Sequence, residues 1–129
     1  MAWLCLDTHI SGKTRLGLLG HSGWIEYREE EGRAHRVLTI IAAWHKQDPK
    51  LIQGVAVVEG PGSFSAIRTG VLYADLYARL RHLPLVALGP DHLADPVALF
   101  EKIQDGTLSR TTYVAPVYDQ EPNITVPRA

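Results

Sequence analysis

Residues 55–70 read VAVVEGPGSFSAIRTG, and this stretch decides the fold. It opens with Val55–Val58, an unbroken apolar run that is typical of a strand covered on both faces. A glycine-rich loop follows at 60–65, and the residues after it predict a helix that runs to about His82. A buried strand, a tight loop and a long helix in this order indicate a crossover unit that extends a sheet with parallel strands.

On the N-terminal side of this stretch, the sequence predicts three strands followed by a helix. The strands are expected over Trp3–Asp7, Thr14–Leu19 and Trp24–Glu30. Because the turns between them are short, neighbouring strands must run antiparallel. The period then becomes helical, with one apolar stripe formed by Val37, Ile40, Ile41 and Trp44. Asp48-Pro49 ends that helix.

On the C-terminal side, Leu85–Leu88 predicts a second covered strand. Asp95-Pro96 is a helix start, and that short helix is expected to stop near Asp105. Thr112–Ala115 could add an edge strand, but the prolines after it forbid a long one. We therefore expect a lobe over residues 1–105 and a C-terminal strand with an extended tail over residues 106–129.

The resulting order is β-β-β-α-β-α-β-α in an α/β protein with a mixed five-stranded sheet. Right-handed crossovers that advance in one direction place the first two long helices on the same face. This order predicts a single lobe of the ribonuclease H-like type, which is half of an actin-type ATPase fold. Many unrelated activities occur on this scaffold, so the topology assigns no function.

Composition excludes several classes of protein. The 129 residues are enough for one domain, and 46% hydrophobic with 21% charged residues is ordinary for a globular chain. Thirteen basic residues against 14 acidic ones give a net charge of −1, so the chain is a poor candidate for binding nucleic acid by itself. Cys5 is the only cysteine, and neither a signal peptide nor a membrane-spanning run is evident. We expect a cytoplasmic protein with no membrane contact.

The loop at 60–65 is the strongest candidate site. It lacks the Lys-Ser/Thr ending of a Walker phosphate loop, and its serines lack the flanking glycines of a nucleophile elbow. It could hold an anion at the helix start, or it could be a tight turn with Ser63 or Ser65 as the N-cap. We expect Gly62 to adopt backbone angles that are open only to glycine.

The remaining polar residues do not form a catalytic or metal site. Asp7 could bind a cation, but a single carboxylate is a weak ligand set, so a bond to Thr8 and the adjoining loop is the other interpretation. No two of the six histidines are three or four residues apart. Cys5 lies within an apolar strand and is expected to be a small buried residue. We expect no catalytic residue, no metal and no cofactor.

The helix after the loop carries three stripes along its length. A narrow stripe of mostly small residues comprises Ile67, Gly70, Val71, Ala74 and Ala78. A polar stripe comprises Arg68, Asp75 and Arg79. A bulky apolar stripe comprises Leu72, Tyr73, Leu76 and Leu80. A helix on the outside of a sheet needs one apolar stripe, so the third one packs on the neighbouring helix or faces another protein.

The stretch at 60–70 resembles the signature of the TsaB (YeaZ) family, Gly-Pro-Gly-Ser-Phe-Thr-Gly-Leu-Arg-x-Gly. The positions that carry the resemblance are Gly60, Pro61, Gly62, Ser63, Phe64, Ser65, Arg68 and Gly70. Ser65 stands for the threonine, Ala66 for a glycine and Ile67 for the leucine. Leu6-Asp7-Thr8 is similar to the family's Ile-Asp-Thr, and 84–88 is similar to the strand after the signature helix.

The resemblance implies a catalytically silent partner of TsaD. That enzyme, with the ATPase TsaE, takes part in attaching a threonylcarbamoyl group to the adenosine beside the anticodon of certain tRNAs. The chain would be a reduced version that lacks most of the family's second lobe. The expected partner interface comprises Val37, Ile41, Trp44, Leu72, Tyr73, Leu76 and Leu80. A TsaE-type ATPase and tRNA could be further partners within the complex, and the sequence leaves open whether the isolated chain is a monomer or a homodimer.

Two alternatives remain open from the residues. The chain could be a self-standing nucleotide- or anion-binding enzyme that uses Asp7 and the loop at 60–65. It could also be a homodimeric interaction module with no connection to tRNA. Arg79, Arg81 and His82 form a small basic corner, which is either a contact for tRNA or simply the end of a helix.

Overall fold

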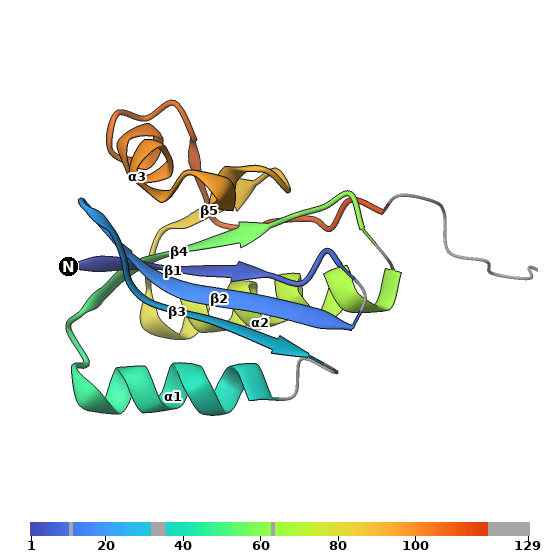
Figure 1. Cartoon of the computed structure of the whole chain (residues 1–129), viewed down its shortest axis with the longest axis horizontal. Coiled ribbons are helices and arrows are strands. Elements are labelled where there is room, and N and C mark those ends of the chain that lie inside the picture. Colours follow the sequence, from blue (N-terminus) through green and yellow to red (C-terminus); the bar gives the residue numbers. More distant parts are fainter. Residues whose placement is uncertain (11, 32–35, 63, 119–129) are drawn as a thin grey trace, which may run out of the picture.

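The computed structural model describes residues 1–10, 12–31, 36–62 and 64–118 (Figure 1). Its elements are β1 (Ala2–Asp7), β2 (Lys13–Gly20), β3 (Gly23–Glu31), α1 (Val37–Gln47), β4 (Ile52–Val58), α2 (Phe64–Arg81), β5 (Leu85–Leu88), a short 3₁₀ turn η2 (His92–Ala94), α3 (Pro96–Gln104) and β6 (Arg110–Thr111). Within these ranges, no helix has the length and apolar character needed to cross a lipid bilayer.

One mixed sheet organises the described chain, with the strand order β3-β2-β1-β4-β5-β6. β1, β2 and β3 are antiparallel neighbours, and β4 and β5 extend the sheet in parallel from β1. The predicted order of strands and helices is therefore confirmed. β2, β3 and α1 separate β1 from β4 in the sequence, and α2 connects β4 to β5.

The predicted number of strands was wrong, because β6 adds a sixth. It pairs antiparallel with β5 through Leu85–Thr111 and Val86–Arg110. The predicted edge strand at Thr112–Ala115 is not a strand. The hydroxyl of Thr111 donates to the carbonyl of Tyr113 (3.1 Å) and accepts from the Tyr113 N–H (3.4 Å). This local turn uses backbone groups that a continuing strand would offer to β5.

Helices cover both faces of the sheet. α1 and α2 lie on one face, as predicted, and α3 lies on the other (Figure 1). Side chains alternate along β1, so Leu4 and Leu6 join the core under α1 and α2, whereas Trp3 and Cys5 join the core under α3. Burial of each large apolar side chain contributes about 1.5–3 kcal/mol, and these two cores hold the fold.

The apolar stripe of α1 belongs to this core. Val37, Ile41 and Trp44 are exposed by no more than 5%. Their expected place in a partner interface was therefore wrong. α1 carries a single apolar stripe, and this stripe covers the part of the sheet that would otherwise meet water.

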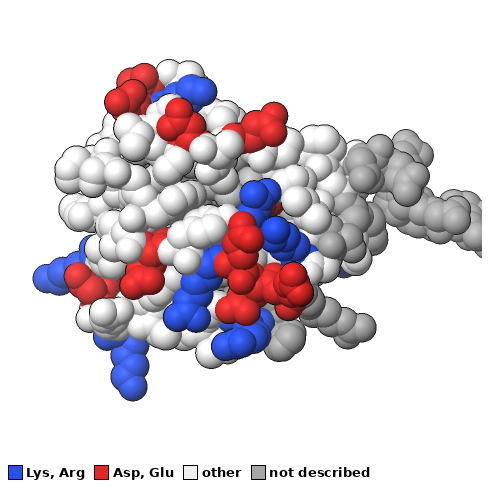
Figure 2. All heavy atoms as spheres, viewed as in Figure 1, with Lys and Arg blue, Asp and Glu red and all other residues white. Residues whose placement is uncertain are grey.

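The edge strand β3 is charged along its exposed face. Figure 2 shows acidic and basic side chains intermixed on this side of the molecule. Lys13 Nζ lies 3.2 Å from Glu29 Oε2 across the β2–β3 pair, and Glu26 and Arg28 are exposed. Charged side chains on an edge strand discourage pairing with other chains, so the open edge at β3 is protected.

Candidate functional site

The loop at 60–62 lies at the C-terminal end of β4, beside the end of β1. Carboxyl ends of adjacent parallel strands form the usual ligand position of open α/β sheets. Two segments that are remote in sequence contact this loop, namely residues 8–9 after β1 and residues 117–118 near the C-terminus. Ser63 lies outside the described residues, as does the side chain of Phe64.

Thr8 joins the end of β1 to the first turns of α2. Its hydroxyl donates to the carbonyl oxygen of Ala66 at 2.6 Å. A Cβ placed on Gly70 would overlap Thr8 Oγ1, so a side chain at position 70 would separate α2 from β1. The two sequence motifs, 6–8 and 60–70, are therefore in direct contact, and Gly70 is required by this close approach.

Gly62 is also required, but for a reason that differs from the prediction. Its φ is not in the left-handed region, and a Cβ there would lie 2.5 Å from His9 O and 2.7 Å from Ile67 Cγ1. The left-handed residue of the loop is Gly60, with a φ of +119°, and its Cβ would overlap the carbonyl oxygen of Val117. Position 62 requires glycine because there is no space for a side chain. Position 60 requires glycine because of both its backbone angle and the lack of space.

The C-terminal segment covers the loop. The Val117 N–H donates to the carbonyl oxygen of Glu59 at 2.6 Å, and Tyr118 forms a parallel bridge with Gly62. About three turns into α2, Asp75 Oδ1 accepts from the Val114 N–H at 3.1 Å, and burial raises the pKa of that carboxyl group. The loop is thus held between residues 8–9 and this segment.

Ser65 does not cap the helix. α2 begins at Phe64, so Ser65 lies in its first turn, where its carbonyl oxygen accepts from the Thr69 hydroxyl at 3.0 Å. The alternative N-cap, Ser63, lies outside the described residues. Arg68 is exposed in the following turn.

Asp7 is buried, with 1% of its surface exposed, and its two oxygens have different partners. Oδ1 accepts from the His9 N–H at 2.9 Å, and Oδ2 lies 2.8 Å from Arg15 Nη2 on β2. The partners are therefore His9 and Arg15 in place of the expected Thr8. Among the residues that the structure describes, no three His, Cys, Asp or Glu side chains gather as a metal site would need. The geometry gives Asp7 a structural role, because an ion pair at this depth is costly to separate.

The three stripes of α2 have different surroundings. The small stripe is buried, with Ile67, Val71, Ala74 and Ala78 at 4% exposure or less. Leu72, Leu76 and Leu80 are 58%, 48% and 69% exposed, and we name them the leucine stripe. Tyr73 is half-buried against the core. Packing against α1 therefore does not cover the leucine stripe in this chain.

α1 and α2 meet near their C-terminal ends through Arg81. Its Nη1 lies 2.7 Å from His45 Nε2, and its Nη2 donates to the carbonyl oxygen of Pro49 at 3.0 Å. This contact ties the end of α2 to the turn that follows α1. It fixes the relative position of the two helices while the leucine stripe stays exposed.

Nothing in the sequence predicted that residues 114–118 cover the loop. Their contacts are made by backbone groups of Val114 and Val117, and backbone contacts leave no pattern of side chains to read. Burial of Val114 at 2% exposure, beside exposed Tyr113 and Ala115, is an alternation too short to interpret alone.

No protein-family model matches the sequence, and none of the curated proteins matches it either. Solved structures do match. YeaZ from Pseudomonas aeruginosa superposes with a TM-score of 0.58 and 20% identity over 69% of this chain and 45% of that one. An uncharacterized protein described as similar to peptidase YEAZ from Pseudomonas aeruginosa gives 0.58 and 21% over 68% and 43%.

RuvC of T. thermophilus, solved in complex with a Holliday junction substrate, gives a TM-score of 0.53 and 17% identity. The match covers 86% of this chain and 99% of that one. The chain thus spans less than half the length of the two YeaZ-type structures but nearly all of the RuvC chain. The chain has the ribonuclease H-like fold that its element order predicted, in the single-lobe form, and it is similar in structure to YeaZ.

Proposed function

We propose that this chain is a non-catalytic partner subunit of a TsaD-type threonylcarbamoyl transferase, within the machinery that makes threonylcarbamoyladenosine in tRNA. The observation that carries the proposal is the leucine stripe. Leu72, Leu76 and Leu80 follow one another at intervals of one helical turn on α2, the helix that begins in the signature loop. The likeness in fold to YeaZ and the resemblance of residues 6–8 and 60–70 to the TsaB motifs support a TsaD-type protein as the proposed partner.

The leucine stripe suits a helical partner. Side chains at i and i+4 form a ridge on a helix, and such ridges pack into the grooves of a facing helix. The three leucines are each about half exposed or more, and the exposure of apolar side chains to water is unfavourable. Burial in a protein interface would remove this unfavourable exposure. Arg68 and Arg79 are exposed in the adjacent polar stripe and would lie at the rim, where charge sets orientation more than affinity.

The site geometry favours a silent role over independent catalysis. The single carboxylate at the end of β1 is held by Arg15 and His9. Val117 covers the loop that would have to approach a phosphate, and bulk at His9 fills the other side of Gly62. An enzyme that cut nucleic acid with two metal ions would need several carboxylates gathered at this edge. Asp7 ends β1 and Glu59 follows β4, but among the described residues no three His, Cys, Asp or Glu side chains form such a group.

The proposal is tested by co-expression with the TsaD-type protein of the same genome. We expect the two chains to co-purify and to elute together from a sizing column. Addition of a TsaE-type ATPase, ATP, a threonylcarbamoyl donor and tRNA to that pair should give modified tRNA, and the mixture without this chain should give much less. A chain that elutes only as a homodimer, with no bound TsaD-type protein and no effect on modification, would contradict the proposal.

A further inference from the structure

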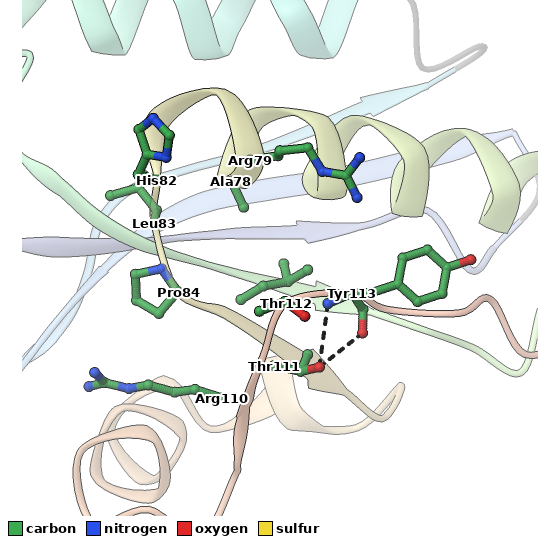
Figure 3. Close-up of a pocket in the computed structure, with 10 residues that line it drawn as sticks. Ala78, Arg79, His82, Leu83, Pro84, Arg110, Thr111, Thr112 and Tyr113 are labelled. Atoms are coloured by element: carbon green, nitrogen blue, oxygen red, sulfur yellow. Dashed lines mark hydrogen bonds between the residues drawn. The ribbon is translucent and has the colours of Figure 1, made fainter.

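The segment after β6 follows the polar stripe of α2. Tyr113 and Arg79 line the same cleft, and both side chains extend toward the start of α2 (Figure 3). The Val114 N–H donates to Asp75 Oδ1, one turn closer to that start. The segment therefore runs beside α2 in the direction opposite to that of the helix.

The last described residue, Tyr118, lies at the start of α2. It forms a parallel bridge with Gly62, and α2 begins at Phe64. The leucine stripe is the neighbouring strip of the helix surface, because four residues, as from Arg68 to Leu72, make one turn plus about 40°. A chain that turns back at this point passes from the polar stripe to the leucine stripe.

Residues 119–129, DQEPNITVPRA, follow Tyr118 and lie outside the part of the chain that the structure describes. Their sequence contains a turn signal, since Pro122 and Asn123 suit the two central positions of a β-turn. Ile124 and Val126 come directly after it, separated by one polar residue. In an extended segment, this alternation places both apolar side chains on one side.

The spacing of the two apolar side chains fits the leucine stripe. Residues i and i+2 of an extended segment are about 6.6 Å apart, and residues i and i+4 of a helix are about 6 Å apart along its axis. Ile124 and Val126 can therefore contact two consecutive leucines, Leu72 and Leu76. The reach is sufficient, because the six residues from Tyr118 to Ile124 span up to about 20 Å, and Leu72 lies about 12 Å along α2 from its first residue.

The charges complement this direction of approach. Asp119 and Glu121 precede the apolar pair, and Arg68 is exposed near the start of α2, where these residues would pass. Arg79 is a second exposed cation on the same stripe. Opposite charges at the rim orient such a contact, and the apolar side chains at its centre supply the affinity.

We propose that residues 119–129 cover the leucine stripe in the isolated chain, with Ile124 and Val126 against Leu72 and Leu76. This intramolecular contact competes with any protein that binds the stripe, so partner binding must displace it. The contact does not depend on the identity of the partner, whereas its effect on a TsaD-type protein rests on the proposed function.

The test is paramagnetic broadening in the NMR spectrum of the full chain. Thr125→Cys carries a nitroxide label between the two apolar residues, and Cys5 does not react because it is buried. We expect the amide signals of residues 68–80 to broaden most. The matched control is the same labelled chain with Ile124→Ser and Val126→Ser. It keeps the length and the charges of residues 119–129 and should lose most of that broadening.

The effect on partner binding is measured with Ile124→Ser/Val126→Ser in the unlabelled chain. Coverage of the stripe for two-thirds of the time reduces the apparent affinity for a partner about threefold. The double variant should therefore bind a TsaD-type protein about threefold more tightly or better, whereas Thr125→Ser should bind like the unchanged chain. If no form of the chain binds a TsaD-type protein but the broadening behaves as expected, the intramolecular contact stands and the proposed function fails.

Three results would overturn the contact. The first is that the labelled chain with both serine substitutions broadens residues 68–80 as much as the chain without them. The second is that broadening is strongest at 82–85 and 110–113, since residues 119–129 would then occupy the cleft of Figure 3. The third comes from a mixture of isotope-labelled chain and nitroxide-labelled chain. Broadening of the same size in that mixture would mean that a second copy supplies the contact.

Discussion

Thr8 donates a hydrogen bond of 2.6 Å to the carbonyl oxygen of Ala66, and so joins the end of β1 to the first turn of α2. Gly70 lies one turn further along α2, where its missing side chain leaves room for the Thr8 hydroxyl and methyl groups. Thr8 is 2% exposed, so this contact is part of the interior. The contact gives a physical reason why a small hydroxyl residue and a glycine occur at these two positions.

Gly70→Ala should destabilise the fold by about 1–3 kcal/mol, because the added methyl group overlaps Thr8. Thr8→Ala should cost about 1 kcal/mol through the lost hydrogen bond. Denaturant unfolding of the two single variants and the double variant gives the coupling between them. We expect the double variant to lose less unfolding free energy than the sum of the two single losses, since Thr8→Ala creates room for the methyl group. Additive losses would mean that the two residues do not share this space.

Gly62→Ala should also destabilise by about 1–3 kcal/mol, because its Cβ would press on the His9 carbonyl and on Ile67. Gly12→Ala is the matched control, since a Cβ there would meet no atom within 4 Å. Gly12 has a φ of +77°, so its loss should be near 1 kcal/mol and due to the backbone alone. Thermal melting of both variants decides. If Gly62→Ala has the same melting temperature as the unchanged protein, Gly62 is not packed against His9 and Ile67 as described.

His82→Gly should stabilise the fold by about 0.5–1 kcal/mol. His82 ends α2 at a φ of +55°, a position that glycine occupies without strain. His82→Ala keeps the Cβ and should bring no gain, so it serves as the control. A loss of stability in the glycine variant, measured by denaturant unfolding, would mean that the imidazole makes contacts worth more than the strain.

Lowering the pH should destabilise the fold, because His92 is held neutral in the folded chain. Burial lowers the pKa of its ring, the nearby Lys102 acts in the same direction, and the ring accepts a hydrogen bond from the Gly89 N–H at 2.8 Å. The unfolded chain binds the proton more readily, so this contribution is complete above about pH 6.5 and is lost as the pH falls below it. His92→Gln should therefore flatten the fall in stability between neutral and mildly acidic pH, whereas the exposed His21→Gln should not. Equal pH dependence in both variants would exclude His92 as the cause.

The sequence predicted those helices and strands whose positions follow from the pattern of apolar side chains alone. The runs at 55–58 and 85–88 are apolar on both faces, and both form covered strands between the helices. The buried stripe of α2 followed from its small residues at helical spacing. The position of the loop at 60–65 between β4 and α2 was predicted for the same reason, since its glycines stand between a covered strand and a helix.

Backbone contacts explain what could not be predicted. β6 and the segment at 114–118 are held by main-chain hydrogen bonds to β5 and Glu59, and such bonds are open to almost any residue. The interface prediction for α1 was wrong because a helical stripe has the same pattern whether it covers its own sheet or a partner. The reason for Gly62 was also missed, because crowding by His9 depends on the tertiary structure.

The most direct test of the central claim is the affinity of the TsaD-type protein for Leu76→Arg, measured by calorimetry beside the unchanged chain. Leu76 is 48% exposed at the middle of the leucine stripe, so the variant should stay folded by circular dichroism. A cation in the centre of an apolar interface commonly costs about 2 kcal/mol or more, which weakens binding roughly thirtyfold. Val97→Arg places the same charge on α3, across the sheet, and should bind normally. We predict that Leu76→Arg stays folded and no longer binds the TsaD-type protein. A folded Leu76→Arg that binds as tightly as Val97→Arg would contradict the proposed interface.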